Sequence, residues 1–121
     1  MTKFSYFLGS EQWQPETLLK HAQLAKKAGF DMVTISEHFH PWVDDYSASN
    51  FTWTTLGALA KDLNNMDLGT GVTTPLWRIH PGVIAQASAT VDRLTNSTFH
   101  LGVGTGAVSY THLTLPTNHP V

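Results

Sequence analysis

The sequence predicts an α/β fold and, within that class, the N-terminal half of a (β/α)8 TIM barrel. Short apolar stretches that begin near residues 3, 30, 66 and 99 predict four β-strands. A stretch with helical spacing of its apolar residues lies between each strand and the next, so the predicted order is βαβαβαβ. A unit of about thirty residues that repeats in this way indicates parallel strands joined by crossover helices. Four strands of an eight-stranded barrel leave the barrel unclosed.

The predicted strands are short apolar runs, each followed by glycine or by polar residues, a pattern typical of strands. They cover residues 3–8, 30–36, 66–72 and 99–103. We expect Val33, Ile35 and Val103 to point into the barrel interior, where branched apolar side chains form packed layers.

Three helices are predicted between these strands. Proline favours the first turn of a helix, and Pro15 and Pro81 begin the first and third helices, while the second covers residues 52–63. Gly29 follows the basic last turn of the first helix and predicts its end. The expected apolar faces are Leu18, Leu19, Ala22 and Ala25, then Leu56, Leu59, Ala60 and Leu63, and finally Ile84, Ala87, Val91 and Leu94.

A doubly wound open sheet would show the same order of elements, so the barrel assignment needs a second observation. Polar and aromatic residues gather directly after the second, third and fourth strands, and a barrel draws its site from several strand ends. The turn after the first strand also lacks the Gly-x-Gly-x-x-Gly pattern of dinucleotide-binding domains. Both observations favour the barrel.

Composition excludes several classes of function. The 121 residues carry a formal net charge of −2, without the excess of Lys and Arg that nucleic-acid binding needs. The absence of cysteine excludes disulfides and thiolate metal sites. No signal peptide and no membrane-spanning apolar stretch is visible, so we expect a cytoplasmic protein that does not bind membranes.

Two regions are expected in the chain. Residues 1–106 contain all of the predicted strands and helices and form the half barrel. Residues 107–121 contain two prolines and no helical periodicity, and they are similar to translated cloning sequence. This segment is therefore predicted to be a non-native or disordered tail.

The densest group of chemically useful residues follows the second strand. Residues 36–42 read Ser-Glu-His-Phe-His-Pro-Trp. Histidine exchanges protons near neutral pH, so His38 is a candidate acid/base, and Trp42 offers an aromatic wall. In an extended segment His38 and His40 would point to the same side, and a barrel-fold metal-dependent hydrolase could use such a pair. That alternative stays open, although no further ligand pair follows it and no metal site is predicted.

Two glycine-rich segments end the third and fourth strands. Gly69 and Gly71 lie in the first segment, and Gly102, Gly104 and Gly106 in the second. Glycine lets a backbone approach a flat ligand or adopt a tight turn. The two segments alone do not decide between these uses.

Four blocks of sequence together resemble the luciferase-like oxidoreductases. They are Ser-Glu-His-Phe-His-Pro-Trp at 36–42, Leu-Gly-Thr-Gly-Val-Thr-Thr-Pro at 68–75, His-Pro-Gly-Val-Ile-Ala-Gln-Ala at 80–87 and Leu-Gly-Val-Gly-Thr-Gly at 101–106. Within this superfamily they are most similar to the branch of F420-dependent glucose-6-phosphate dehydrogenases. The resemblance extends from residue 4 to residue 106 with matching order and spacing.

The resemblance implies that the complete protein binds coenzyme F420 across the carboxyl-end mouth of its barrel. It further implies hydride transfer between the deazaflavin ring and a small alcohol or carbonyl substrate, a sugar phosphate among the candidates, in a homodimer. His38 would be the acid/base and Trp42 would line its pocket. Coenzyme contacts are implied for Glu37, Gly71, Val72, Thr74, Thr105 and Gly106, with a cis peptide bond between Gly71 and Val72.

Three alternatives and one departure accompany this resemblance. With FMN in place of F420, the protein would be a luciferase-like monooxygenase. With a metal bound by His38 and His40, it would be a metal-dependent hydrolase. The half barrel by itself would be an inactive self-associating fragment.

The departure concerns the end of the fourth block. The family pattern continues Gly-Thr-Gly with a glutamate that acts as a second acid/base. This chain has Ala107 at that position, and alanine exchanges no proton.

Overall fold

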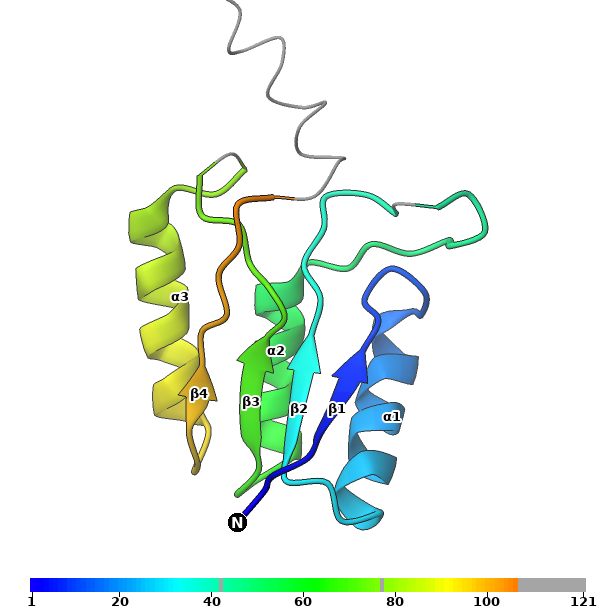
Figure 1. The fold of residues 1–121 in the computed structure, drawn as a ribbon, viewed down its shortest axis with the longest axis vertical. Coiled ribbons are helices and arrows are strands. Elements are labelled where there is room, and N and C mark those ends of the chain that lie inside the picture. The colour runs from blue at the N-terminus through cyan, green and yellow to red at the C-terminus, as the bar shows by residue number, and fades with distance from the viewer. Residues whose placement is uncertain (42, 77, 107–121) are drawn as a thin grey trace, which may run out of the picture.

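The computed structural model describes residues 1–41, 43–76 and 78–106 as one parallel sheet flanked by helices (Figure 1). The sheet contains β1 (Ser5–Leu8), β2 (Met32–Ile35), β3 (Asp67–Thr70) and β4 (Phe99–His100). The helices are α1 (Pro15–Lys27), α2 (Thr52–Asp62) and α3 (Pro81–Leu94). The predicted order of strands and helices is therefore confirmed. The predicted tail, residues 107–121, lies outside the described residues.

The strand order identifies the architecture as part of a barrel. The four strands lie side by side in the order β1-β2-β3-β4, and every pair is parallel. A doubly wound sheet reverses its strand order at a switch point, whereas a barrel adds each strand next to the previous one. The loops that follow β2, β3 and β4 gather at one end of the sheet, at the top of Figure 1.

Helix ends follow their predicted signals. Pro15 and Pro81 occupy the first turns of α1 and α3. Gly29 has φ of 97°, a left-handed conformation that favours glycine, and it directly follows the Ala28 C-cap of α1. The His80 side chain accepts a hydrogen bond from the Gly82 N–H at 2.9 Å and caps α3. Among the described residues, no helix has the length and apolar character needed to cross a membrane.

The hydrophobic core lies between the sheet and the helices, which corrects one prediction. Val33 and Ile35 are buried in this core, on the helix side of β2, rather than pointing into the barrel interior. Val103 lies beyond β4, and 58% of its surface is exposed. In this core the Val33 and Ile35 side chains belong to one buried cluster with apolar residues of α1 and α2.

The opposite face of the sheet, which a closed barrel would enclose, is more polar. The alternation of side chains and the strand register place Ser5, Phe7, Thr34, Asp67 and His100 on this face. The Ser5 and Thr34 hydroxyls lie 3.2 Å apart, within hydrogen-bonding distance. Phe7 has 55% of its surface exposed because nothing among the described residues covers it.

The predicted inner face of α3 is correct except at its last residue. Ile84 and Val91 are buried, and Ala87 packs against the core. Leu94 is 42% exposed, whereas the next residue, Thr95, is buried and donates a hydrogen bond to the Met66 carbonyl. The buried stripe thus continues from Val91 to Thr95, which leaves Leu94 on the outside.

Two glycines allow β3 and β4 to approach each other closely. A Cβ atom added to Gly102 would lie 2.2 Å from the Thr70 carbonyl oxygen, and one added to Gly69 would lie 2.8 Å from the His100 carbonyl oxygen. Both distances are far shorter than a van der Waals contact. These glycines therefore serve strand packing rather than the approach of a ligand.

Asp67 holds the amino-terminal end of the sheet together. Its carboxylate accepts hydrogen bonds from the Ser97 hydroxyl, the Thr98 N–H and the His100 imidazole, and it lies 3.7 Å from the Lys3 ammonium. Burial acts to raise the pKa of Asp67, but the hydrogen bonds from Ser97 and His100 outweigh it and lower this pKa to about 2.

Replacement of Asp67 by asparagine should destabilise the protein in a pH-dependent way. The folded pKa lies below the ordinary value of 3.8, so the stabilisation is present above pH 4 and is lost as the pH falls towards 2. In the complete barrel, meaning residues 1–106 continued by the remaining strands, Asp67→Asn should lower the free energy of unfolding by roughly 2 kcal/mol at pH 7 and by about half as much at pH 3. Urea unfolding at both pH values measures this. The exposed Asp45→Asn is the control, and a loss that is equal at both pH values would contradict the prediction.

Candidate functional site

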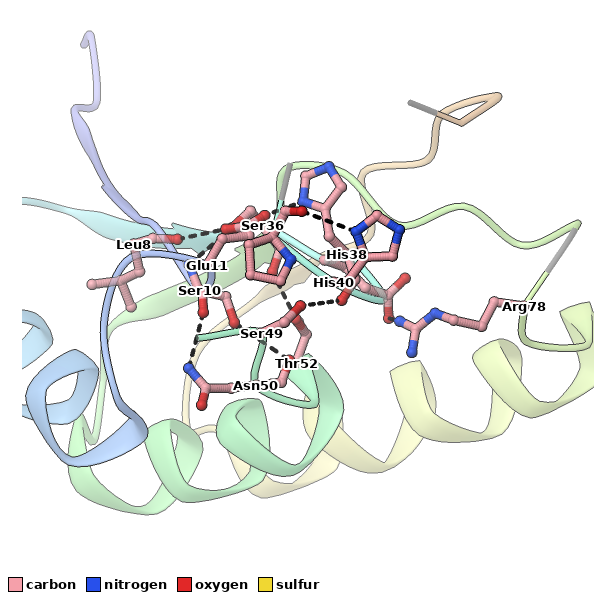
Figure 2. A network of polar contacts seen from close by, with 12 residues as sticks. Leu8, Ser10, Glu11, Ser36, His38, His40, Ser49, Asn50, Thr52 and Arg78 are labelled. Atoms are coloured by element: carbon pink, nitrogen blue, oxygen red, sulfur yellow. Dashed lines mark hydrogen bonds and ion pairs between the residues drawn. The ribbon is translucent and has the colours of Figure 1, made fainter. Parts of the chain in front are cut away.

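His38 lies at the carboxyl end of the sheet, on the loop that follows β2 (Figure 2). Its side chain is 20% exposed, and its Nδ1 atom contacts the Glu11 carboxylate. The His38 carbonyl accepts a hydrogen bond from the Ser49 hydroxyl at 2.9 Å. His38 is therefore held at its side chain by Glu11, from the loop after β1, and at its backbone by Ser49, from the loop after β2.

Glu11 is a buried acid that comes from the loop after β1. Its second carboxylate oxygen accepts a hydrogen bond from the Ser36 hydroxyl at 2.5 Å. Burial acts to raise the pKa of Glu11, but the hydrogen bonds from His38 and Ser36, together with attraction to His38, lower it overall. An anionic acceptor at Nδ1 keeps a proton on that nitrogen, which leaves the lone pair of a neutral imidazole on Nε2. This arrangement is suited to acid/base chemistry.

A second layer of hydrogen bonds fixes the loop that carries Glu11. The Asn50 amide donates to the Ser10 carbonyl at 3.0 Å and to the Trp13 carbonyl at 2.7 Å. The Ser10 N–H donates to the Ser36 hydroxyl oxygen at 3.0 Å, and the Thr52 hydroxyl donates to the Ser36 carbonyl at 2.6 Å. Figure 2 shows Ser10, Ser36, Asn50 and Thr52 as part of one network around Glu11 and His38. The start of α2 thus supports the site.

A cavity of about 230 Å³ opens beside His38 at the ends of β1, β2 and β3. It is lined by Phe7, Gly9, Glu11, Gln12, Ser36, His38, Tyr46 and Gly71. A larger and shallower hollow of about 810 Å³ lies on α1, where Leu19, Leu24 and Lys27 are among its lining residues. Of these two hollows, the smaller one combines an acid/base pair with the carboxyl ends of the strands, where parallel α/β proteins place their sites.

The end of β3 forms one wall of the site. The peptide bond between Gly71 and Val72 is cis, as the resemblance implies. The Thr73 N–H donates to the Gly102 carbonyl at 2.8 Å, and the Gly104 N–H donates to the Thr73 carbonyl at 2.9 Å. This bridge continues the pairing of β3 and β4 beyond the sheet.

The Glu37 carboxylate is buried behind this wall, with 1% of its side chain exposed. It accepts a hydrogen bond from the Thr73 hydroxyl, and its Oε2 atom lies 3.5 Å from Nη2 of Arg78. Arg78 lies just before α3, and its guanidinium lies about 6 Å from the ring centres of Phe39 and Phe51. Glu37 thereby joins the loop after β2 to the loop after β3.

The residues predicted from the sequence gather at this end of the sheet. His38 and Gly71 line the same cavity. The other residues predicted to contact the coenzyme differ in burial: Glu37 and Thr74 are buried, whereas Val72, Thr105 and Gly106 are exposed. Trp42 lies outside the described residues.

Glu11 and Arg78 were not predicted from the sequence. Glu11 follows the first strand by a few residues, so its position at a strand end was the one available signal. Arg78 lies in a loop without any distinguishing pattern.

The geometry does not favour the alternative in which His38 and His40 bind a metal. His38 Nδ1 contacts Glu11, whereas His40 Nδ1 lies 2.9 Å from the Pro41 carbonyl oxygen. Within residues 1–41, 43–76 and 78–106, no group of three or more His, Asp or Glu side chains is arranged to hold a metal ion.

Two curated relatives are similar to this chain over most of its length. It is 41% identical over 99 residues to the F420-dependent hydroxymycolic acid dehydrogenase of Mycobacterium tuberculosis, which covers 82% of the chain and 28% of that protein. It is 42% identical over 108 residues to the F420-dependent glucose-6-phosphate dehydrogenase of Beutenbergia cavernae, which covers 88% of the chain and 32% of that protein. The chain therefore spans about a third of the length of these relatives.

A solved structure and a family model agree with these relatives. The structure of an F420-dependent secondary alcohol dehydrogenase in complex with an F420-acetone adduct matches with a TM-score of 0.83 and 34% identity, over 87% of this chain and 32% of that one. The model of the luciferase-like monooxygenase family matches residues 2–119. The chain therefore belongs to the luciferase-like monooxygenase family.

Proposed function

We propose that this chain supplies the acid/base and part of the coenzyme wall of an enzyme that transfers a hydride between coenzyme F420 and a small alcohol or carbonyl compound. The observation that carries the proposal is the buried Glu11 carboxylate in contact with His38 Nδ1 beside a cavity at the strand ends. The similar proteins described as F420-dependent dehydrogenases support the choice of coenzyme.

The residues at the strand ends fit a flat ring of low polarity. Val72 and Val103 expose apolar surface at the ends of β3 and β4, and Gly71 borders the cavity that His38 lines. When bound, the deazaflavin ring would accept or give the hydride. Val72 would pack behind the ring, and Thr74, Thr105 and Gly106 would contact the coenzyme.

His38 would move the proton that accompanies the hydride. In the oxidation of an alcohol, Nε2 would take the hydroxyl proton as the hydride leaves the carbon, and the same atom would return it in the reverse direction. The positive charge that develops on the imidazole would be stabilised by Glu11, whose pKa is lowered and which therefore stays anionic. Trp42 would line the substrate pocket. We propose a homodimer for the complete protein and include sugar phosphates among its substrates.

The proposal predicts a specific optical change in the complete barrel. Mixed with oxidised F420 and a panel of secondary alcohols and sugar phosphates, the protein should bleach the visible absorbance of the deazaflavin in step with formation of the carbonyl product. Stopped-flow absorbance with product analysis measures both. Turnover that occurs only with FMN and oxygen would contradict the proposal and indicate a monooxygenase, and hydrolysis that depends on added zinc or manganese would indicate the hydrolase.

A further inference from the structure

We propose that Arg78 and Glu37 are positioning residues, which hold the loop after β3 in place beside His38. We call the group formed by Glu37, Arg78 and Thr73 the clamp. The proposal rests on the proposed function for its role in catalysis, whereas the clamp itself can be tested without any coenzyme.

The clamp connects loops that are far apart in the sequence. Glu37 follows β2 and is adjacent to His38, whereas Thr73 follows β3 and is adjacent to Val72. One Glu37 oxygen accepts a hydrogen bond from the Thr73 hydroxyl, and the other lies 3.5 Å from Arg78 Nη2. In Figure 2 the Arg78 guanidinium extends from the loop before α3 towards the residues that follow β2. A shift of this carboxylate would therefore be transmitted to both loops.

Burial reduces the screening of the Glu37–Arg78 ion pair by water. Glu37 has 1% of its side chain exposed and Arg78 has 21%, so water screens the ion pair poorly. Phe39 and Phe51 lie about 6 Å from the guanidinium, within the range of cation–π attraction. Removal of Arg78 would take one charge partner from a carboxylate with 1% of its side chain exposed, which disfavours the native arrangement.

The clamp also reaches β4 through the backbone of Thr73. The Thr73 N–H and carbonyl both bond to the segment after β4, at Gly102 and Gly104. The ends of three neighbouring strands are thus held in register behind the proposed coenzyme wall. The segment from Val72 to Thr74 is where loss of the clamp should be detected first.

A rival role for Glu37 makes a different prediction. If Glu37 acted only by direct contact with the coenzyme, Arg78 would contribute little, and the effects of changing the two residues would be independent. If the two residues act as a clamp, either change removes the same interaction, so the double variant should be no worse than each single variant.

The first experiment needs no coenzyme. Amide hydrogen exchange in the complete barrel should be at least ~10-fold faster at Thr73 and Gly104 in Arg78→Gln and in Glu37→Gln, because these amides depend on the clamped loop. The Leu68 amide, which donates to the Thr98 carbonyl inside the sheet, should be protected as before. Arg93→Gln, an exposed arginine on α3, is the matched control. Unchanged exchange at Thr73 in Arg78→Gln would overturn the clamp.

The second experiment measures coenzyme affinity by titration with F420. Arg78→Gln, Glu37→Gln and the double variant should each bind about 10-fold more weakly than the parent, and Arg78→Lys should recover part of the loss because it restores the charge. Additive losses, or a loss in Glu37→Gln without one in Arg78→Gln, would overturn the clamp in favour of direct contact. Should Glu37→Gln fail to fold, the F420 affinities of Arg78→Gln and Arg78→Lys decide the question. Each is compared with the affinity of the control Arg93→Gln. A parent that binds no F420 refutes the proposed function, and the exchange experiment still decides the clamp.

Discussion

Replacement of His38 by alanine in the complete barrel should lower kcat by roughly 10²–10⁴, the usual loss when a general acid/base is removed. The Glu11–His38 contact holds the ring beside the cavity, and alanine removes the nitrogen that would take the substrate proton. The affinity for the coenzyme should change far less, because a neutral imidazole contributes little binding energy there. Steady-state turnover and coenzyme titration of the same preparations measure the two effects separately.

The loop itself provides a matched control in His40→Ala. His40 belongs to the same segment, but it is exposed and its Nδ1 atom faces the carbonyl of the next residue. This variant should retain turnover. Glu11→Gln should be intermediate, because glutamine can accept the hydrogen bond from Nδ1 but cannot stabilise a charged imidazole. Equal losses in His38→Ala and His40→Ala, or unchanged turnover in His38→Ala, would remove His38 from the mechanism.

The fold could be predicted because each signal was local. Proline at the first turns of α1 and α3, and glycine after α1, mark helix ends within a few residues of sequence. The direction in which a strand side chain points is different, because both faces of a barrel strand are covered and an apolar run such as β2 does not reveal which side is inside. Val33 and Ile35 were therefore assigned to the wrong face.

The site could be predicted only where its residues are clustered in the sequence. His38 lies in a segment dense in polar and aromatic residues, and its position after a strand agrees with that of barrel sites. Its partner Glu11 is 27 residues away and belongs to a different strand end. Contacts of this kind arise from the sheet register, which aligns the ends of β1 and β2. The contacts of the buried Glu37 carboxylate with Thr73 and Arg78 are of the same long-range kind, and the sequence did not predict them.

The isolated 121-residue chain should be inactive and should self-associate rather than form a stable monomer. In the described residues, β1 and β4 each lack a neighbour on one side, so their N–H and C=O groups form open edges that can pair with another chain. The face that a closed barrel would enclose exposes Phe7 to water. Leaving one large apolar side chain exposed forgoes about 1.5–3 kcal/mol, while the total stability of a protein is typically about 5–15 kcal/mol.

The structure places few large apolar side chains on this inner face, so the open edges should contribute more to self-association than the sequence alone indicated. Phe7→Ser should weaken association moderately, because it removes apolar surface beside the β1 edge but leaves the edge itself. Leu24→Ser is the matched control, since Leu24 is 62% exposed on α1, away from the sheet edges. Analytical ultracentrifugation with thermal melting measures the result. A monodisperse monomer with a cooperative transition and bound F420 would show that the half barrel is stable and functional by itself.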